Sequence, residues 1–313
     1  MHTIGFDIGG TKIAAAVVDA SGRELSEARR DTPDTWAETS AALHSALTEL
    51  LHACPDAAAV GVGIAGLVDR SGYLSYGPNL PGIEHVDVQG ELSRLFPLPV
   101  VVDNDANVAA YGEAKHGAIR GVDDALVVTL GTGIGGGLII GGEVYRGGHG
   151  FAAEIGHITI DLDGPVCACG ERGHWEALAS GNALGRMGRE AASEGRVPSV
   201  LAQAGGVVAA ITGHEVGQAA AAGAPDALAL IDEYADLVAV GLASLANILD
   251  PSVIVISGGI INLGDVLMRP ARKHFIARIE AGTERPVPEL VAAELGERAG
   301  VIGAAALARR SVA

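Results

Sequence analysis

Two glycine-rich turns join predicted β-strands, and their composition suits the binding of phosphate groups. The first is Asp7-Ile-Gly-Gly-Thr-Lys12, and the second is Gly131-Thr-Gly-Ile-Gly135. Glycine allows successive backbone N–H groups to point into one concavity, and the threonine in each turn adds a hydroxyl donor. One such turn alone is better explained as an ordinary tight hairpin. Two of them, at corresponding places in the two halves of the chain, favour a nucleotide site.

Two better-known nucleotide motifs do not fit this sequence. Gly131, Gly133 and Gly136 match the spacing GxGxxG, but that motif must open a helix, and the apolar run at 138–140 is typical of a strand. The Walker A pattern GxxxxGK[ST] does not occur in the chain. We therefore expect phosphate groups to bind at the two hairpin turns.

A run of carboxylate and amide side chains forms a second candidate site. The segment Asp103-Asn-Asp-Ala-Asn107 follows an apolar strand at 99–102 and begins a helix that extends to about His116. One of these residues is expected to cap the helix. Three in a row exceed what capping requires, and the carboxyl end of a strand is where α/β proteins place ligands.

A third candidate site contains two histidines and two cysteines, namely His157, Cys167, Cys169 and His174. Together they would supply two nitrogen and two sulfur ligands to a tetrahedral zinc ion. The CxC spacing is tighter than the usual CxxC, so two buried thiols and two ordinary histidines stay as an alternative. Glu154 and Glu176 flank this stretch, and their carboxylates are good acceptors for the hydroxyl groups of a sugar.

The elements that carry these sites alternate along the chain as in an α/β protein. Thr35 and Glu38 have the spacing of a capping box at the start of a helix, and a strand at 57–64 contains two glycines that imply close backbone approach. The order of strand, glycine turn and strand at the amino terminus recurs from residue 125, which we interpret as an internal duplication of architecture. A helix at 227–249 is apolar nearly all round in its second half and is therefore expected to be buried. This alternation predicts helices covering mixed sheets.

Composition narrows the range of partners. The 313 residues suggest two domains, and the net charge of −17 without any Lys/Arg-rich run argues against nucleic acid and membrane surfaces as partners. The apolar stretch 237–249 is too short for a membrane span, and the first residues lack the features of a signal peptide. Three cysteines cannot form a disulfide framework. We expect a cytoplasmic protein.

The motifs resemble those of a known superfamily. Asp7-Ile-Gly-Gly-Thr-Lys12, Leu130-Gly-Thr-Gly-Ile-Gly-Gly-Gly137 and Ile256-Ser-Gly-Gly259 are similar to the two phosphate segments and the adenosine segment of actin-like sugar kinases. Within that superfamily the chain resembles the ROK family (repressors, open reading frames, kinases) from about residue 3 to 307. The resemblance implies two ribonuclease-H-like (actin-like ATPase) α/β domains with a ligand cleft between them. It places a small domain at 1–112, a large domain with a zinc-binding loop at 113–298, and a helix at 299–313 that returns to the small domain.

The resemblance also implies a role for each candidate residue. Asp105 would be the general base, and Asp7 is a candidate for contact with hydrated Mg²⁺. The substrate-binding residues would be Gly66, Asn79, Asn104, Asp105, Glu154, His157 and Glu176, although Asn79 is nearly as well explained as a turn residue between Pro78 and Pro81. The ATP-binding residues would be Asp7, Gly9, Gly10, Thr11, Lys12, Gly131, Thr132, Gly133, Gly135, Gly258 and Gly259.

One position departs from the family pattern. His174 stands where the family has a third cysteine after CxCG. Imidazole is a competent zinc ligand, so the simplest hypothesis is a retained structural site. A weaker site completed by water and a loop without metal stay as alternatives.

The expected activity is that of an ATP-dependent hexose kinase, with the family's bacterial glucokinases as the most similar members. Mannose, fructose, N-acetylmannosamine or N-acetylglucosamine are alternative substrates, and polyphosphate is an alternative donor. A sugar-sensing regulator is a remote alternative, because the first phosphate hairpin begins within ten residues of the start of the sequence. A homodimer or homotetramer is expected from the family.

Overall fold

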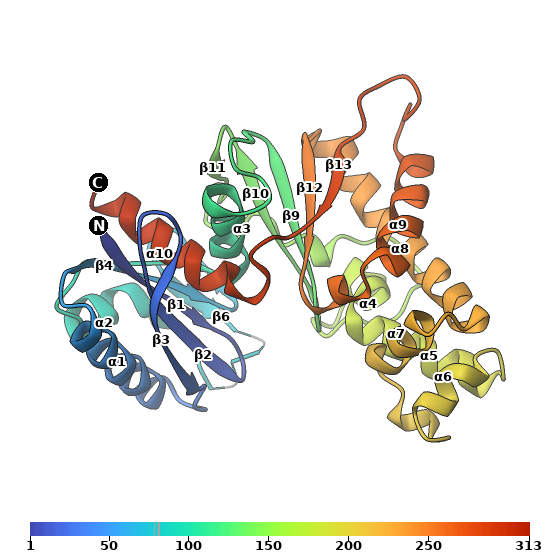
Figure 1. The fold of residues 1–313 in the computed structure, drawn as a ribbon, viewed down its shortest axis with the longest axis horizontal. Coiled ribbons are helices and arrows are strands. Elements are labelled where there is room, and N and C mark those ends of the chain that lie inside the picture. The colour runs from blue at the N-terminus through green and yellow to red at the C-terminus, as the bar shows by residue number, and fades with distance from the viewer. Residues whose placement is uncertain (78, 81) are drawn as a thin grey trace. The chain divides into compact units, whose positions relative to one another are not determined.

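The computed structural model describes residues 1–77, 79–80 and 82–313, and the two prolines that flank the predicted turn at Asn79 lie outside this set (Figure 1). The chain forms two compact units. Unit 1 comprises Met1–Val127, Gly136–Ala153 and Ala293–Ala313, and unit 2 comprises Val128–Gly135 and Glu154–Ala292. The domain limits expected from the sequence, 1–112 and 113–298 with a returning helix at 299–313, stay a prediction.

The first sheet has the strand order β3-β2-β1-β4-β8. β1 pairs antiparallel with β2, and β2 with β3, whereas β4 lies parallel to both β1 and β8. Gly9-Gly10-Thr11 is therefore a hairpin turn, as predicted. Ile8 pairs with Ile64, and Ile64 pairs with Asn104, so the carboxyl ends of three strands meet at one edge of the sheet. The strands are β1 (His2–Ile8), β2 (Lys12–Val18), β3 (Glu24–Asp31), β4 (Ala57–Ile64) and β8 (Val100–Asn104).

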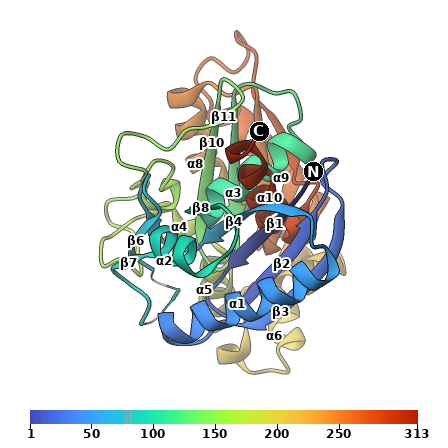
Figure 2. The same cartoon turned by 90° about the vertical axis from the view of Figure 1, so that its left-hand side faces the viewer.

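Helix α1 (Trp36–Ala53) covers one face of this sheet and runs beside β2 and β3 (Figure 2). Side chains alternate between the two faces of a strand, and Ile4 and Phe6 of β1 share a buried cluster with Leu43 of α1. Thr35 is the helix cap, as predicted, but Glu38 bonds to the Thr35 hydroxyl and not to its backbone N–H, so half of the capping box is formed. The Thr35 hydroxyl accepts the N–H of Glu38 at 3.3 Å and donates to the Glu38 carboxylate at 2.7 Å.

Helix α10 (Ala299–Ser311) covers the opposite face of the first sheet and packs directly on strand backbone. A Cβ atom on Gly5 would lie 2.0 Å from the carbonyl oxygen of Val301, and one on Gly61 would lie 1.9 Å from that of Ala304. Only glycine leaves room for this approach, and the prediction for the strand at 57–64 is confirmed at Gly61. Packing of α10 therefore joins the last residues of the chain to β1 and β4.

The second sheet repeats the topology of the first. Its order, β11-β10-β9-β12-β13, again places the third, second, first, fourth and fifth strands side by side, which confirms the predicted duplication of architecture. β10 begins at Ile134, four residues earlier than the predicted strand at 138–140. Position 137 requires glycine, because a Cβ atom there would lie 2.4 Å from the Cβ of Ala110. The strands are β9 (Ala125–Leu130), β10 (Ile134–Ile140), β11 (Glu143–Val144), β12 (Val253–Ser257) and β13 (Glu289–Ala292).

The remaining elements complete the two units. In unit 1 they are β5 (Leu67–Val68), β6 (Tyr73–Tyr76) and β7 (Val86–Asp87), which form a small sheet, with α2 (Val88–Leu95), α3 (Asp105–His116) and η4 (Gly296–Arg298). In unit 2 they are η1 (Ile155–His157), α4 (Trp175–Ala179), α5 (Gly181–Ser193), α6 (Pro198–Gln203), η2 (Val208–Ala210), α7 (Gly213–Ala221), α8 (Pro225–Leu249), η3 (Gly259–Leu263) and α9 (Asp265–Arg278).

Helix α8 forms the core of unit 2, as its apolar sequence predicts. Trp175 is fully buried against it and donates its indole N–H to the carbonyl oxygen of Leu237 at 3.1 Å. A Cβ atom on Gly241 would lie 2.1 Å from the Trp175 ring, so glycine provides the space for this indole. Among the helices of the described residues, none combines the length and the apolar character that a membrane span requires.

Candidate active site

Asp105 is the first residue of α3 and follows directly after the carboxyl end of β8. Asn104 is the helix cap, since its Oδ1 accepts the N–H groups of Ala106 at 2.8 Å and Asn107 at 3.1 Å. Its Nδ2 donates to the carbonyl oxygen of Gly66 at 3.0 Å. The side chain of Asn104 also forms a hydrogen bond with the Asp105 carboxyl group. Asn104 is therefore held by the first turn of α3, by Gly66 and by Asp105.

Two carboxyl groups near this helix end have raised pKa values. Burial raises the pKa of Asp105 above its ordinary value, because the charged form loses contact with water. Burial raises the pKa of Asp7, at the end of β1, to about 7, and the negative charge of Asp105 adds to that rise. The positive charge of Lys12 acts in the opposite direction. Asp7 and Asp105 are therefore electrostatically coupled, and a bound cation would favour their ionised forms.

The first glycine hairpin lies beside these carboxyl groups. The turn is closed by the N–H of Gly9, which donates to the carbonyl oxygen of Lys12 at 3.0 Å. Gly10 packs against the backbone of Asn79, where a Cβ atom would lie 2.4 Å from the Asn79 carbonyl oxygen. Gly10, Thr11 and Lys12 are exposed. Unit 1 thus brings together the tip of the hairpin, Asp7 and the predicted sugar residue Asn79.

The second glycine hairpin is anchored by Glu176 of α4. The Glu176 Oε2 accepts the N–H of Ile134 at 2.8 Å, and a Cβ atom on Gly133 would lie 2.1 Å from the same oxygen. The carbonyl oxygen of Gly131 accepts the N–H of Gly181, the first residue of α5, at 2.7 Å. Thr132, at the tip, is exposed. Glu176, predicted to bind sugar, therefore also holds a predicted phosphate turn.

Gly258 and Gly259 follow β12 and lie next to the second hairpin. Gly258 has a φ of +84°, and a Cβ atom there would lie 2.4 Å from the carbonyl oxygen of Leu130. Both the left-handed backbone and the close contact require glycine. Gly259 begins η3, and a Cβ atom there would meet no heavy atom within 4 Å. This open backbone is accessible to a planar ligand group.

The four predicted zinc ligands converge within unit 2. Their ligand atoms all lie within 4.8 Å of one another. The Nδ1 of His174 is 3.2 Å from the Sγ of Cys169 and 3.3 Å from the Nδ1 of His157. The Sγ of Cys167 is 3.9 Å from the Nδ1 of His157. Two sulfur and two nitrogen donors at this spacing fit a tetrahedral zinc ion, and a histidine in the fourth position is compatible with it.

The backbone of the Cys/His loop is held by a short ladder of hydrogen bonds. The N–H of Cys167 donates to the carbonyl oxygen of Glu171 at 2.7 Å, and the N–H of Trp175 donates to that of Ile158 at 2.9 Å. His157 directs its Nδ1 into the cluster, which leaves Nε2 as the ring nitrogen that can contact a ligand. Glu154 caps η1, and its carbonyl oxygen accepts the N–H of His157 at 3.1 Å. The loop therefore determines the positions of two predicted sugar residues.

The candidate residues fall into two groups, one in each unit. Unit 1 contains the first hairpin together with Gly66, Asn79, Asn104 and Asp105, and unit 2 contains the second hairpin together with Glu154, His157, Glu176, Gly258 and Gly259.

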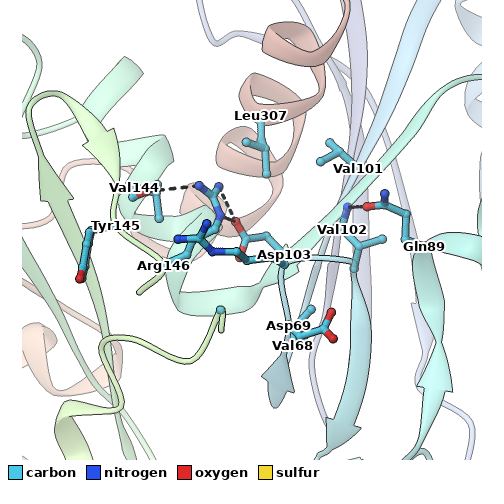
Figure 3. A pocket seen from close by; sticks show the side chains of 12 residues that line it. Val68, Asp69, Gln89, Val101, Val102, Asp103, Val144, Tyr145, Arg146 and Leu307 are labelled. Carbon is cyan, nitrogen blue, oxygen red and sulfur yellow. Dashed lines mark hydrogen bonds and ion pairs between the residues drawn. The ribbon is translucent and has the colours of Figure 1, made fainter. Parts of the chain in front are cut away.

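The sequence did not single out Arg146, which pairs with Asp103 beside the α3 terminus (Figure 3). No motif relates two residues so far apart in sequence.

The duplicated mixed sheets, with their hairpins and the acidic helix terminus between strand β8 and α3, define an actin-like α/β fold of the sugar-kinase type. The chain belongs to the ROK family, whose pattern it matches over residues 3–311. The expected family and fold class are thereby confirmed.

Several relatives carry the name glucokinase. The glucokinase of Streptomyces coelicolor is 42% identical over 310 residues, which cover 98% of this chain and 97% of that protein. The glucokinase of Thermotoga maritima is 35% identical over 317 residues and covers 100% and 98% of the two chains. The crystal structure of a ROK family glucokinase from Streptomyces griseus, in complex with glucose and AMPPNP, superposes with a TM-score of 0.87 at 42% identity and covers 99% of this chain and 100% of that one.

Proposed function

We propose that this chain is an ATP-dependent glucokinase, which transfers the terminal phosphoryl group of ATP to the 6-hydroxyl of glucose. The observation that carries the proposal is the placement of Asp105, a partly buried carboxylate at a helix N-terminus, next to an Asn104 side chain that is held by Gly66, by Asp105 and by the first turn of α3. Full-length similarity to several glucokinases supports the same activity. The cytoplasm, where glucose and ATP meet, is the proposed location.

Asp105 would orient the attacking hydroxyl and accept its proton. The hydroxyl oxygen forms a bond to the terminal phosphorus while the bond from that phosphorus to the bridging oxygen of ADP breaks, and the proton passes to a carboxylate oxygen of Asp105. Phosphoryl transfer has a loose transition state, so the base mainly positions the nucleophile. The N-terminus of α3 stabilises the ionised carboxylate that this role requires.

The exposed tips of the two glycine hairpins would donate N–H and hydroxyl groups to the phosphate oxygens. Gly10 and Thr11 belong to one hairpin, and Gly131, Thr132 and Gly133 belong to the other. Lys12, which pairs with Glu297 at 3.1 Å on the surface, would turn its ammonium group toward the same phosphates. Hydrated Mg²⁺ would be held near Asp7, and it supplies positive charge that offsets the charge of the transferring group. Gly258 and Gly259 would lie against the adenosine portion.

Sugar recognition would come from both groups of residues. Asn104, the backbone of Gly66 and the side chain of Asn79 would contribute from unit 1. Glu154, Glu176 and the Nε2 of His157 would bind the remaining hydroxyl groups. Zinc bound by His157, Cys167, Cys169 and His174 would hold the loop in its folded form and would take no part in the reaction. A homo-oligomer is proposed from the family alone.

A screen of ADP release tests this proposal. The purified protein is assayed with MgATP against glucose, mannose, fructose, N-acetylglucosamine and N-acetylmannosamine, because one 35% identical relative is an N-acetylmannosamine kinase. We expect the highest kcat/KM with glucose. Polyphosphate replaces ATP in a parallel assay, since a 27% identical structure is a polyphosphate/ATP-glucomannokinase. A higher kcat/KM for an N-acetylated sugar would refute glucose as the substrate, and inactivity with all sugars would refute the kinase function.

A further inference from the structure

A buried ion pair lies next to the proposed catalytic residues, and one of its members, Arg146, was not part of any motif. The carboxylate of Asp103 is 7% exposed, and its Oδ2 accepts the Nε of Arg146 at 2.7 Å and the Nη2 of the same guanidinium at 2.6 Å. The Arg146 Nη1 donates in addition to the carbonyl oxygen of Val144 at 3.2 Å. Figure 3 shows these bonds, with Arg146 reaching from the segment after β11 to the end of β8. The guanidinium is therefore fixed by three donated bonds.

The other oxygen of Asp103 is bonded to the first turn of α3. Its Oδ1 accepts the backbone N–H of Asn104 at 2.8 Å and the side-chain Nδ2 of Asn107 at 2.9 Å. Asn104 and Asn107 are in turn bonded to each other, through the Asn104 Oδ1 and the Asn107 N–H at 3.1 Å. Asp103 thus links Arg146 to both residues that flank Asp105 and Ala106 in the sequence.

The surroundings of the Arg146–Asp103 pair indicate that it has a structural role. A cavity of about 450 Å³ adjoins it, lined by the aliphatic side chains of Val68, Val101, Val102 and Leu307 as well as by charged groups. The charged groups at this cavity have partners within the chain. Asp69 accepts the N–H groups of Ser71 and Tyr73, and Arg70 donates to the carbonyl oxygen of Gly147. Arg146, by contrast, directs its donors at Asp103 and Val144 and neutralises a carboxylate that is 7% exposed.

We propose that Arg146 is a positioning residue, which through Asp103 fixes the first turn of α3 and so sets the orientation of Asn104 and Asp105 toward the sugar hydroxyl. This inference rests on the proposed kinase function. The physical reason is that a buried carboxylate without its countercharge either takes up a proton or moves toward water. Protonation weakens the acceptor that serves the Asn104 N–H and Asn107, and movement toward water withdraws it. Small displacements of a catalytic group lower turnover far more than they lower nucleotide binding.

The test compares kinetics and amide hydrogen exchange of Arg146→Ala, Arg146→Lys and Asp103→Asn with those of the wild type. We expect kcat with glucose to fall about 100-fold in Arg146→Ala, with a raised KM for glucose and an unchanged KM for ATP. Arg146→Lys should recover part of kcat, because lysine restores the charge without the paired donors. In Asp103→Asn an amide NH₂ would face other donors, so this variant should resemble Arg146→Ala. The double variant should be no worse than either single one.

Exchange of the amides of Asn104, Ala106 and Asn107 supplies a readout that does not depend on activity. It should accelerate in Arg146→Ala while exchange in α8 stays unchanged. Arg70→Ala is the matched control, since Arg70 lies at the same cavity and does not contact Asp103, and it should keep wild-type kcat and exchange. Wild-type kcat and wild-type exchange in Arg146→Ala would overturn the proposal. A uniform increase of exchange over unit 1, together with equal increases in the KM for glucose and the KM for ATP, would overturn it as well.

The outcomes separate this inference from the proposed function. If the wild type phosphorylates no hexose, the glucokinase proposal fails, and exchange at residues 104–107 still decides whether Arg146 positions the α3 terminus. If the wild type is active and Arg146→Ala is equally active, the proposed function stands and the positioning role is wrong. If Arg146→Ala does not fold, the same comparison with the wild type is made with Arg146→Lys and Asp103→Asn.

Discussion

At the scale of single residues, the site depends on how carboxyl groups are held. Asp105, Asp103 and Asp7 lie within or beside the same strand ends and differ in their partners. Asp103 is neutralised by Arg146, Asp105 lies at a helix N-terminus, and Asp7 shares its surroundings with the charge of Asp105. Of these, the sequence predicted that Asp105 and Asp7 belong to the site. It could not predict that Asp103 is paired, because the partner lies 43 positions away.

The raised pKa of Asp7 predicts a pH-dependent stability for the protein without ligand. A carboxyl group whose pKa is higher in the folded state than in the unfolded state stabilises the fold fully at low pH, and this contribution is lost as the pH rises through its folded pKa, here about 7. Asp7→Asn cannot ionise. We subtract the free energy of unfolding of the wild type from that of Asp7→Asn. This difference should be larger at pH 8 than at pH 4.5 by about 1–2 kcal/mol, after allowance for solvent screening.

Chemical denaturation at the two pH values measures this difference. Asp123→Asn, a change at an exposed aspartate that precedes β9, serves as the control and should show no such pH dependence. A constant difference between Asp7→Asn and the wild type across this range would mean that Asp7 titrates like an ordinary carboxyl group.

At the scale of elements, turns and caps were the most predictable features. The two glycine hairpins, the helix cap at Thr35 and the cap at the start of α3 are local, so the residues that form them are neighbours in the sequence. The Cys/His loop was predictable as a cluster for the same reason. The anchoring of the second hairpin by Glu176 was not predictable, since it joins Ile134 to a residue 42 positions later.

The loop that carries the proposed zinc site gives a prediction at this scale. His174→Ala removes one of four ligands and opens the buried side of the cluster, because His174 is 8% exposed. We expect purified wild type to contain one zinc ion per chain and His174→Ala to lose it, with zinc affinity lower by at least about 100-fold. His174→Cys should keep the metal.

Metal content by mass spectrometry and thermal unfolding with and without a chelator check this prediction. Replacing the exposed His214 by Ala is the control and should leave the zinc content unchanged. Wild-type protein that is purified with zinc in the medium and nevertheless contains none would contradict the structural zinc site.

At the scale of the whole molecule, the duplicated sheet order follows from the repeated pattern of strand, glycine turn and strand. The return of α10 to the first sheet was expected only from family resemblance. It depends on Gly5 and Gly61 and on backbone contacts. Strand glycines indicate that some backbone approaches closely, but they do not show which segment it is. Glu113 is a further example. It is fully buried, and its carboxylate accepts the N–H groups of Ala118 at 2.8 Å and Leu295 at 2.9 Å.

Glu113 therefore joins the end of α3 to the segment that leads into α10, and its loss should weaken the fold. Glu113→Ala leaves buried N–H groups without acceptors and should lower the free energy of unfolding by about 2–4 kcal/mol. Glu113→Gln keeps one acceptor oxygen and should lose less. Denaturant unfolding measures both, with the exposed Glu171→Ala as the control. Equal stability of Glu113→Ala and the wild type would show that other contacts hold this segment.

The assay that addresses the central claim most directly is glucose 6-phosphate formation by the wild type and by Asp105→Asn, measured together with glucose binding by calorimetry. Asparagine resembles aspartate in shape but cannot take up the proton of the hydroxyl. The account predicts one glucose 6-phosphate per ATP consumed in the wild type, and a kcat lower by about 100- to 10,000-fold in Asp105→Asn with glucose affinity retained. Near wild-type turnover in Asp105→Asn would contradict it.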